Sequence, residues 1–166
     1  MTNYLKDKVV IITGAAAGFG EILSRKISVM GAKIVAGDID QKGLTKITED
    51  VRDRGGEIIG VTTDVTDRNQ MRLLAEEAVK EFNAIDILIN NAGIMPLAFY
   101  SDHQNAEDSW ERCIDINIKG VLNGITSVHD QMIKQGEGHI VNLASIYGNY
   151  PTAGGGVYGA TKAAVI

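Results

Sequence analysis

The sequence predicts an α/β fold in which a parallel β-sheet is covered by helices on both faces. Short β-branched runs alternate with longer segments in which apolar residues recur at helical spacing. The first run, residues 9–12, is apolar at every position, which is typical of a strand buried on both faces. Strands that alternate with helices of this length join through right-handed crossovers into a parallel sheet. We expect strands at residues 9–12, 33–37, 57–62, 85–89 and 138–143.

Four helices are expected between these strands, and another begins after Gly156. Gly31 closes the first helix and a Gly-Gly pair stops the second, because glycine favours the backbone conformation that ends a helix. Asp67 opens the third helix, with Gln70 three residues later as in a capping box. The helices are expected around residues 19–30, 44–51, 71–82 and 106–134. In the long fourth helix, the residues expected to face inward are Trp110, Cys113, Ile114, Ile118, Val121, Leu122, Ile125 and Val128.

Composition argues against several classes of protein. The chain has 166 residues, 45% of them apolar, and a formal net charge of −5, so it can bury a core without a metal or a disulfide. No basic run could neutralise a row of phosphates, which argues against a nucleic-acid partner. The single cysteine, Cys113, forms no internal disulfide, and neither it nor the histidines show metal-ligand spacing. The first apolar run is too short for a signal peptide or a membrane span, so we expect a cytoplasmic protein without a membrane partner.

No repeat, low-complexity tract or linker divides the chain, so we expect a single domain over residues 1–166. The fifth predicted strand would form a bare sheet edge, which native proteins normally pair or cover. We therefore expect the sequence to be the first part of a longer fold.

A glycine-rich loop follows the first predicted strand and leads into a helix. It reads Thr-Gly-Ala-Ala-Ala-Gly-Phe-Gly over residues 13–20. Gly14, Gly18 and Gly20 let the backbone approach a pyrophosphate, and the helix N-terminus offers free N–H groups and a positive dipole end. The order of the glycines fits neither the common G-x-G-x-x-G fingerprint nor the phosphate loop of NTPases. The loop predicts a nucleotide phosphate site, and ordinary turn chemistry is the alternative.

The second predicted strand leads into Asp38, eighteen residues after Gly20. This offset is close to the ~20 residues expected for the acid that binds the adenosine ribose in dinucleotide-binding folds. A carboxylate there accepts hydrogen bonds from both ribose hydroxyls and repels a 2′-phosphate, and the glycine loop holds no Arg or Lys. These features favour NAD over NADP. The alternative is that Asp38 caps the next helix, which Asp40 could do as well.

Three further motifs follow the fourth and fifth predicted strands. Asn-Asn-Ala-Gly occupies residues 90–93, Ser145 follows the fifth strand, and Tyr158 and Lys162 are four residues apart. With these motifs the chain resembles a short-chain dehydrogenase/reductase of the branch that carries Thr-Gly-x-x-x-Gly-x-Gly, Asn-Asn-Ala-Gly and Tyr-x-x-x-Lys. The resemblance runs from about residue 8 to the last residue. It implies a Rossmann-type, doubly wound parallel sheet from which the last strands of the family's fold are absent.

Tyr158 and Lys162 lie one turn apart on the last predicted helix, so their side chains share a face. An ammonium close to a phenol stabilises the phenolate form. The resemblance implies that Tyr158 exchanges a proton with the substrate oxygen, that Ser145 hydrogen-bonds this oxygen, and that Lys162 also holds the nicotinamide ribose. Tyr4 and Lys8 show the same spacing, but no serine lies upstream of them, so this second match is interpreted as accidental.

Asn117 is the fourth catalytic residue that the resemblance implies. It interrupts the apolar face of the long helix, where a buried amide costs free energy unless it is hydrogen-bonded. The resemblance implies that the backbone of Asn117 takes part in the site, together with an ordered water that links Lys162 to a proton relay. The alternative is an amide that bends or packs the helix.

The resemblance also implies a cofactor site. Asp64, at the end of the third strand, matches the acid beside the adenine amino group, with Val65 against the ring, although Asp64 could equally cap the following helix. Asn90 matches an asparagine that steadies the central sheet. The expected cofactor-binding residues are Gly14, Ala17, Phe19, Gly20, Asp38, Asp64, Val65, Asn91, Ala92, Gly93, Tyr158 and Lys162.

The implied function is hydride transfer between NAD(H) and an alcohol or ketone by an NAD-dependent enzyme. The resemblance further implies a homodimer or homotetramer that forms through the long helix and the next one, and small substrate contacts from residues 95–97 and 146–151. A non-catalytic nucleotide-binding fragment or a redox-sensing module is the alternative. A sugar-nucleotide epimerase or dehydratase is a third possibility, but its glycine loop usually has a different spacing.

Overall fold

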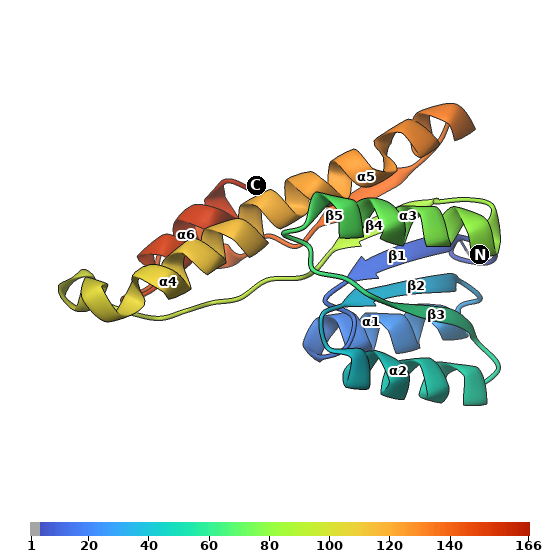
Figure 1. Ribbon diagram of the computed structural model, residues 1–166, viewed down its shortest axis with the longest axis horizontal. Helices are drawn as coiled ribbons and strands as arrows, with labels where there is room; N and C mark the ends of the chain where they lie inside the picture. Colours follow the sequence, from blue (N-terminus) through green and yellow to red (C-terminus); the bar gives the residue numbers. More distant parts are fainter. Residues whose placement is uncertain (1–3) are drawn as a thin grey trace.

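The structure, a computed structural model, describes residues 4–166 and holds a five-stranded parallel sheet. Its strand order is β3-β2-β1-β4-β5, so the chain builds one half of the sheet, returns to the centre and then builds the other half (Figure 1). The register is regular, and Ile11 of β1 lies opposite both Val35 of β2 and Leu88 of β4. This arrangement confirms the predicted α/β architecture. The strands are β1 (Val9–Thr13), β2 (Lys33–Asp38), β3 (Glu57–Thr62), β4 (Ile87–Asn90) and β5 (His139–Asn142).

Helices cover both faces of the sheet, as predicted. In Figure 1, α1 and α2 lie below the sheet and α3 and α5 lie above it. Alternate residues of β1 divide between the two cores: Val10 and Ile12 pack with α1 and α2, whereas Val9 and Ile11 pack with α3 and α5. Because each strand is buried from both sides, its sequence is apolar at successive positions. The covering helices are α1 (Gly18–Val29), α2 (Gln41–Asp53), α3 (Arg68–Phe82) and α5 (Gly120–Gln135).

Aspartates cap the two helices that follow β2 and β3. The Asp40 carboxylate accepts a hydrogen bond from the backbone N–H of Lys42 at 3.0 Å, at the start of α2. At the start of α3, Asp67 accepts from the N–H groups of Asn69 and Gln70 at 2.8 and 3.2 Å. These bonds satisfy N–H groups that a helix cannot pair internally. The predicted opening of the third helix at Asp67 is confirmed.

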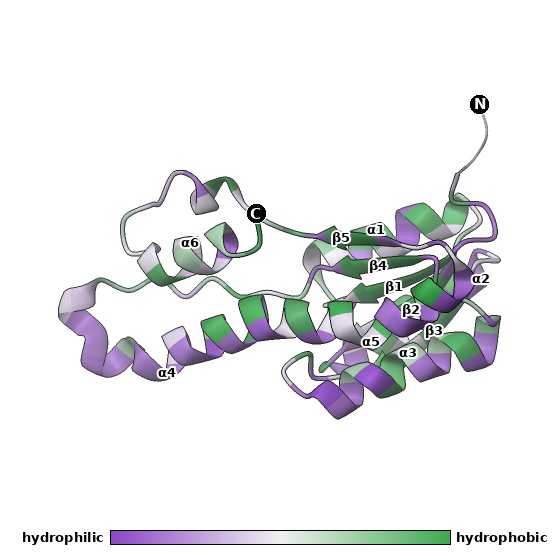
Figure 2. Ribbon diagram, turned by 90° about the horizontal axis from the view of Figure 1, so that it is seen from above, coloured by the Kyte–Doolittle hydropathy of each residue, from purple (hydrophilic) through white to green (hydrophobic). Residues whose placement is uncertain are grey.

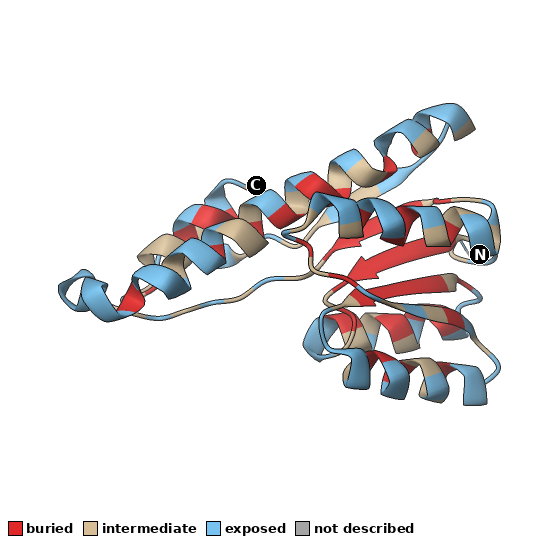
Figure 3. Ribbon diagram, in the orientation of Figure 1, coloured by how far each residue is buried: buried red, intermediate tan, exposed pale blue. Residues whose placement is uncertain are grey.

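The long predicted helix consists of three segments joined end to end. The helix α4 (His103–Ile114) continues through a π-helical turn (Asp115–Lys119) into α5 (Gly120–Gln135), so it begins three residues earlier than predicted. The predicted inward face was wrong at Ile114 and Leu122, which are 40% and 51% exposed. A π turn shifts the phase of a helix, so the spacing in one half does not predict the face of the other. In addition, α4 extends beyond the sheet and is largely exposed (Figure 3).

The last helix, α6 (Gly156–Ala163), packs beside α4 at the end of the molecule that extends past the sheet (Figures 1 and 2). Two loops lead there: the β4–α4 loop, residues 91–102, and the β5–α6 loop, residues 143–155. Within residues 4–166, no helix is long and apolar enough to cross a membrane. The same part of the chain holds no group of three or more His, Cys, Asp or Glu side chains that could bind a metal.

Candidate cofactor and active site

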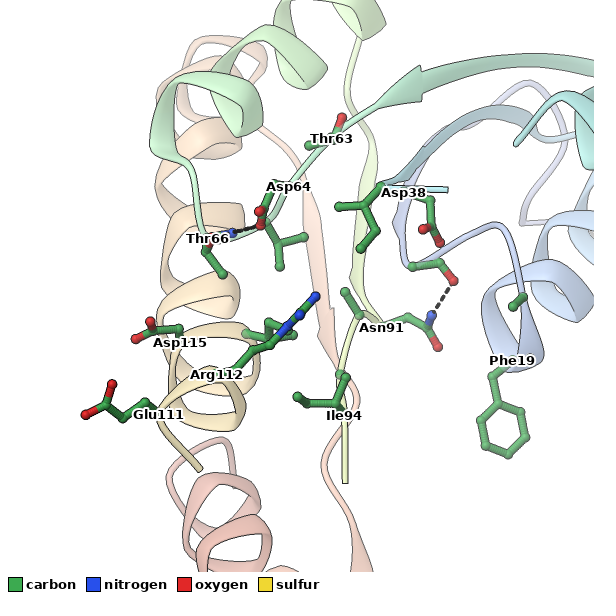
Figure 4. Close-up of a pocket in the computed structure, with 18 of the residues that line it drawn as sticks. Phe19, Asp38, Thr63, Asp64, Thr66, Asn91, Ile94, Glu111, Arg112 and Asp115 are labelled. Atoms are coloured by element: carbon green, nitrogen blue, oxygen red, sulfur yellow. Dashed lines mark hydrogen bonds between the residues drawn. The ribbon is translucent and has the colours of Figure 1, made fainter. Parts of the chain in front are cut away.

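A cleft of about 690 Å³ is lined by the loops that follow β1, β2, β3 and β4 (Figure 4). It lies at the carboxyl ends of the strands, next to the point where the strand order reverses between β1 and β4. Open α/β sheets bind their ligands at such a point. Most of the predicted cofactor residues line the cleft. They are Gly14, Ala17, Phe19, Asp38, Asp64, Val65, Asn91, Ala92 and Gly93.

Glycine is required where the loop after β1 approaches β4 and the start of α1. A Cβ atom on Gly14, whose φ is +66°, would lie 2.9 Å from Cα of Ala92. A Cβ atom on Gly20 would collide with the carbonyl oxygen of Gly14. The side-chain amide of Asn91 holds this contact by donating to the carbonyl oxygens of Thr13 and Gly14 at 2.9 and 3.0 Å. Gly20 therefore supports the loop from beneath and does not itself line the cleft.

The N-terminus of α1 borders the cleft through Ala17, Gly18 and Phe19. Ala17 has an extended backbone and offers no side-chain cap, so the first N–H groups of the helix are free to bind phosphate oxygens. Apart from its chain neighbours and the adjacent backbone of α1, no atom of residues 4–166 lies within 4 Å of a Cβ position on Gly18. This open space and the positive end of the helix dipole fit a pyrophosphate.

Asp38 presents its carboxylate to the cleft from the end of β2. One oxygen accepts from the backbone N–H of Ala16 at 2.9 Å, and the other accepts from the N–H of Asp40 at 3.0 Å. Asp40, and not Asp38, caps α2. The structure therefore removes the capping alternative for Asp38 and leaves a carboxylate that is held in place beside the glycine loop.

Asp64 and Val65 form the cleft wall that follows β3. The Asp64 carboxylate accepts hydrogen bonds from the N–H and the hydroxyl of Thr66 at 2.9 and 2.8 Å. Asp67 caps α3, so Asp64 is not the helix cap either. Val65 is buried and its carbonyl oxygen accepts from the side-chain amide of Asn123 at 2.9 Å. A short turn tied to α5 thus holds both residues at the cleft.

Gly93 lines the cleft and lies against two of the predicted catalytic residues, none of which lines the cleft itself. A Cβ atom there would be 3.2 Å from Oδ1 of Asn117 and 3.5 Å from Nζ of Lys162. Lys162 is only 6% exposed, and its Nζ donates to the carbonyl oxygen of Leu143 at 2.6 Å. The same Nζ lies 5.9 Å from the centroid of the Tyr158 ring. Burial lowers the pKa of Lys162, because removal from water disfavours the charged ammonium.

Asn117 lies in the π-helical turn, and its side chain is fully buried and hydrogen-bonded. Its Oδ1 accepts from the N–H of Ile94 at 2.9 Å, and its Nδ2 donates to the carbonyl oxygen of Ile94 at 3.0 Å. The same Nδ2 donates to the hydroxyl of Thr161 at 3.0 Å, and Thr161 donates to the carbonyl oxygen of Tyr158 at 2.7 Å. The amide therefore joins the β4–α4 loop to α6. Thr161 is a member of this network that the sequence analysis missed.

Ser145 lies at the start of the β5–α6 loop, where its hydroxyl accepts from the N–H of Tyr147 at 3.2 Å. The Tyr147 ring packs edge-on against the Tyr158 ring, with centroids 6.4 Å apart. Within residues 4–166, no direct hydrogen bond joins Ser145 to Tyr158. The loop therefore brings Ser145 and Tyr158 to the same region through Tyr147.

The sequence analysis also missed a group of charged residues on α4 and the π-helical turn. Figure 4 shows the Arg112 side chain extending into the cleft, with Glu111 and Asp115 nearby. Their spacing indicates one side of a helix, but only the packing of that helix decides that this side borders the cleft. The cleft-lining residues that were not predicted are Ile39, Thr63, Thr66, Ile94, Asp108, Glu111, Arg112, Asp115 and Ile116.

Comparison with known proteins identifies the family. The sequence matches the family model described as short chain dehydrogenase over residues 8–166. The chain belongs to the short-chain dehydrogenase family. An uncharacterized oxidoreductase of Staphylococcus saprophyticus is 46% identical over 164 residues, which cover 98% of this chain and 65% of that protein. An NADP-dependent 3-hydroxy acid dehydrogenase of Shigella flexneri is 37% identical over 157 residues, which cover 95% of this chain and 62% of that protein.

A solved structure confirms the fold of this short-chain dehydrogenase. A short-chain dehydrogenase/reductase from Burkholderia phymatum, in complex with NAD, matches with a TM-score of 0.93 at 35% identity. The match covers 99% of this chain and 58% of that one. The Rossmann-type sheet and the resemblance drawn from the motifs are thus confirmed, and the chain spans less than two thirds of the length of these relatives.

Proposed function

We propose that this short-chain dehydrogenase transfers a hydride between NAD(H) and an alcohol or ketone, with Tyr158 as the acid or base. One observation carries the proposal: Gly93 lines the cleft and lies against both Asn117 and Lys162. This contact supports one continuous site that runs from the glycine loop, whose N–H groups suit a pyrophosphate, to the residues proposed for catalysis, although Ser145, Tyr158, Lys162 and Asn117 do not themselves line the cleft. The matching oxidoreductases support the same class of reaction.

In the proposed reduction of a ketone, NADH held by the glycine loop and Asp38 would provide the hydride for the carbonyl carbon. Tyr158 donates its phenolic proton to the carbonyl oxygen, which yields a secondary alcohol and a phenolate that takes up a proton from solvent. Ser145 hydrogen-bonds the same oxygen, and Lys162 stabilises the phenolate through its positive charge and binds the nicotinamide ribose. Asn117 holds the loop and helix that surround Lys162, beside the place proposed for a relay water. Alcohol oxidation reverses these steps.

The proposed cofactor is NAD in preference to NADP. Each oxygen of Asp38 accepts one backbone hydrogen bond, and a carboxylate offers about four acceptor sites, so two sites remain for ribose hydroxyls. A 2′-phosphate would bring like charges together at this position. Four more acids line the cleft and would also repel a 2′-phosphate: Asp64, Asp108, Glu111 and Asp115. The Burkholderia structure contains NAD, whereas the Shigella relative is NADP-dependent, so the proposal rests on these carboxylates.

Substitution of Tyr158 by Phe tests the proposed chemistry. We expect NADH affinity to stay near that of the unmodified chain and turnover to fall by about 10²-fold or more, because a positioned acid or base contributes about that much. Fluorescence titration measures NADH binding, and NADH absorbance measures turnover of a ketone.

Tyr4→Phe is the matched control, because Tyr4 and Lys8 share the Tyr-x-x-x-Lys spacing and lie away from the cleft. It should leave both measurements unchanged. Unchanged turnover in Tyr158→Phe would contradict the assignment of Tyr158. If the unmodified chain binds NADH and turns over no ketone or alcohol, the result supports the alternative, a non-catalytic nucleotide-binding module.

A further inference from the structure

An exposed apolar surface lies beside the catalytic residues and is not used by the proposed chemistry. It combines side chains of the β4–α4 loop and the β5–α6 loop, and we call it the two-loop surface. Single exposed apolar residues are ordinary, but a group of large ones marks a binding surface. The side chains are Leu97 (62% exposed), Phe99 (65%), Ile146 (68%), Tyr147 (36%) and Tyr150 (72%).

The two loops are joined to each other. The N–H of Ala98 donates to the carbonyl oxygen of Gly154 at 2.9 Å. A Cβ atom on Gly155 would lie 3.7 Å from Cδ2 of Leu97, and one on Gly156 would collide with the hydroxyl of Tyr100. The two loops, which are more than forty positions apart in the sequence, therefore meet at the start of α6 (Figures 1 and 2).

The two-loop surface adjoins the reacting groups of the proposed function. The Tyr147 ring contacts the Tyr158 ring edge-on, and the N–H of Tyr147 donates to the Ser145 hydroxyl. On the other loop, the backbone of Ile94 is held by Asn117. A substrate whose oxygen binds Ser145 and Tyr158 would therefore have its substituents beside this surface.

These loops carry almost no charge. Residues 87–101 and residues 140–161 contain no Asp, Glu, Lys, Arg or His, although 22% of the chain is charged. Exposed loops normally carry charged residues, because these are the side chains most often found at surfaces. The first cation after the second stretch is Lys162, whose ammonium is buried and already bonded to the carbonyl oxygen of Leu143. The charged residues of the site, Asp38 and Arg112 among them, line the cofactor cleft instead.

We infer that the substrate is an uncharged ketone or secondary alcohol with an apolar alkyl or aryl substituent that packs on the two-loop surface. This inference rests on the proposed function and names its substrate class. An apolar substituent gains from leaving water, whereas a carboxylate or phosphate would lose its hydration and find no cation on these loops. The chain would differ here from the 3-hydroxy acid dehydrogenase of Shigella flexneri, whose name specifies an acid.

A pair of ketones of similar shape tests the inference: methyl 4-acetylbenzoate, which is neutral, and 4-acetylbenzoate, which carries a carboxylate. We expect kcat/KM with NADH to be higher for the neutral ketone by at least about tenfold, because a site without a partner for a charged group discriminates strongly against it. Equal or higher kcat/KM for the carboxylate would overturn the inference.

Leu97→Lys adds a cation to the two-loop surface. It should lower the ratio of kcat/KM for the neutral ketone to kcat/KM for the carboxylate by at least about threefold, because a nearby counter-charge favours the carboxylate. Tyr150→Lys is a second variant at an exposed position and should act in the same direction. Leu73→Lys is the control, because Leu73 is an exposed leucine of α3, 50% accessible and outside both loops.

If the ratio of kcat/KM for the two ketones stays unchanged in both loop variants, the substrate does not contact this surface and the inference is overturned. A fluorescence titration with NADH separates this result from a failure of the proposed function. If NADH binds and neither ketone is turned over, the proposed chemistry fails, and the substrate inference fails with it.

Discussion

Individual buried polar residues account for most of the geometry of the candidate active site. Asn117 and Thr161 are 0% and 1% exposed, yet their side-chain polar groups are paired. A buried polar group without a partner would cost free energy, so this network restricts how α4, α6 and the β4–α4 loop can pack. Lys162 is buried beside it, and the carbonyl oxygen of Leu143 accepts one of its hydrogen bonds.

The choice of cofactor can be tested at a single residue. In Asp38→Ala, we expect the ratio of kcat/KM for NADPH to that for NADH to rise by about tenfold or more, because like charges brought together cost several kcal/mol and ~1.4 kcal/mol is a factor of ten. Steady-state rates with both cofactors measure this ratio. Asp40→Ala is the control, since Asp40 caps α2 and does not line the cleft. A preference of the unmodified chain for NADPH would contradict the role given to Asp38.

At the scale of the secondary-structure elements, α5 approaches the sheet closely where Gly124 meets Asn90. A Cβ atom on Gly124 would collide with Oδ1 of Asn90 and lie 3.0 Å from its Cγ. Oδ1 of Asn90 is buried without a hydrogen bond to any residue of the described chain, while Nδ2 donates to Oδ1 of Asn142 in β5 at 2.9 Å. The bond to Asn142 limits how far the Asn90 side chain can move, so the helix needs glycine at this position.

We expect Gly124→Ala to lower the free energy of unfolding. Overpacking costs about 1–3 kcal/mol, whereas replacing Gly by Ala inside a helix gains about 1 kcal/mol. In an Asn90→Ala background the collision is gone, so the same substitution should raise the free energy of unfolding. Urea unfolding of the four chains in this double-mutant cycle gives the comparison. Equal effects of Gly124→Ala on the free energy of unfolding in both backgrounds would show that the contact with Asn90 does not affect stability.

At the scale of the whole molecule, the doubly wound sheet brings residues from four loops to one cleft. Parallel strands end at the same edge, and the return of the chain from β3 past β1 to β4 leaves a gap between the helices of the two halves. The part formed by α4 and α6 extends past the sheet and leaves apolar side chains of the long helix exposed, such as Ile114 and Leu122. This exposure supports the expectation, implied by the family resemblance, that copies of the chain associate through the long helix, α4 and α5, and the next one, α6.

The double variant Ile114→Arg with Leu122→Arg tests this association. We expect the unmodified chain to form dimers or tetramers and the variant to be largely monomeric, because two cations would be buried without partners in the interface. Light scattering after size exclusion measures the mass. Val29→Arg is the control, since Val29 is a 77% exposed residue at the end of α1. A monomeric unmodified chain, or a variant that still associates, would contradict the proposal.

Features that depend on neighbouring residues could be predicted from the sequence. Apolar runs and helical spacing predicted every strand to within two residues at its ends, because burial on one or both faces imposes a period on the chain. The start of α3 at Asp67 and the glycine loop could also be predicted, because a helix cap and a tight turn involve residues only a few positions apart. The motifs were also sufficient to recognise the family.

Features that depend on residues far apart in the chain were decided only by the tertiary structure. Asp38 and Asp64 each had two possible roles in the sequence, and only the observed bonds of Asp40 and Asp67 excluded the capping role. The exposure of Ile114 followed from a π-helical turn and from a helix that leaves the sheet. The contacts that join the β4–α4 loop to Asn117 and α6, and the charge-free surface beside Tyr158, form between segments whose proximity no local pattern encodes. Local physics thus determines the elements and their ends, whereas the packing of distant segments decides which side chains meet in the site.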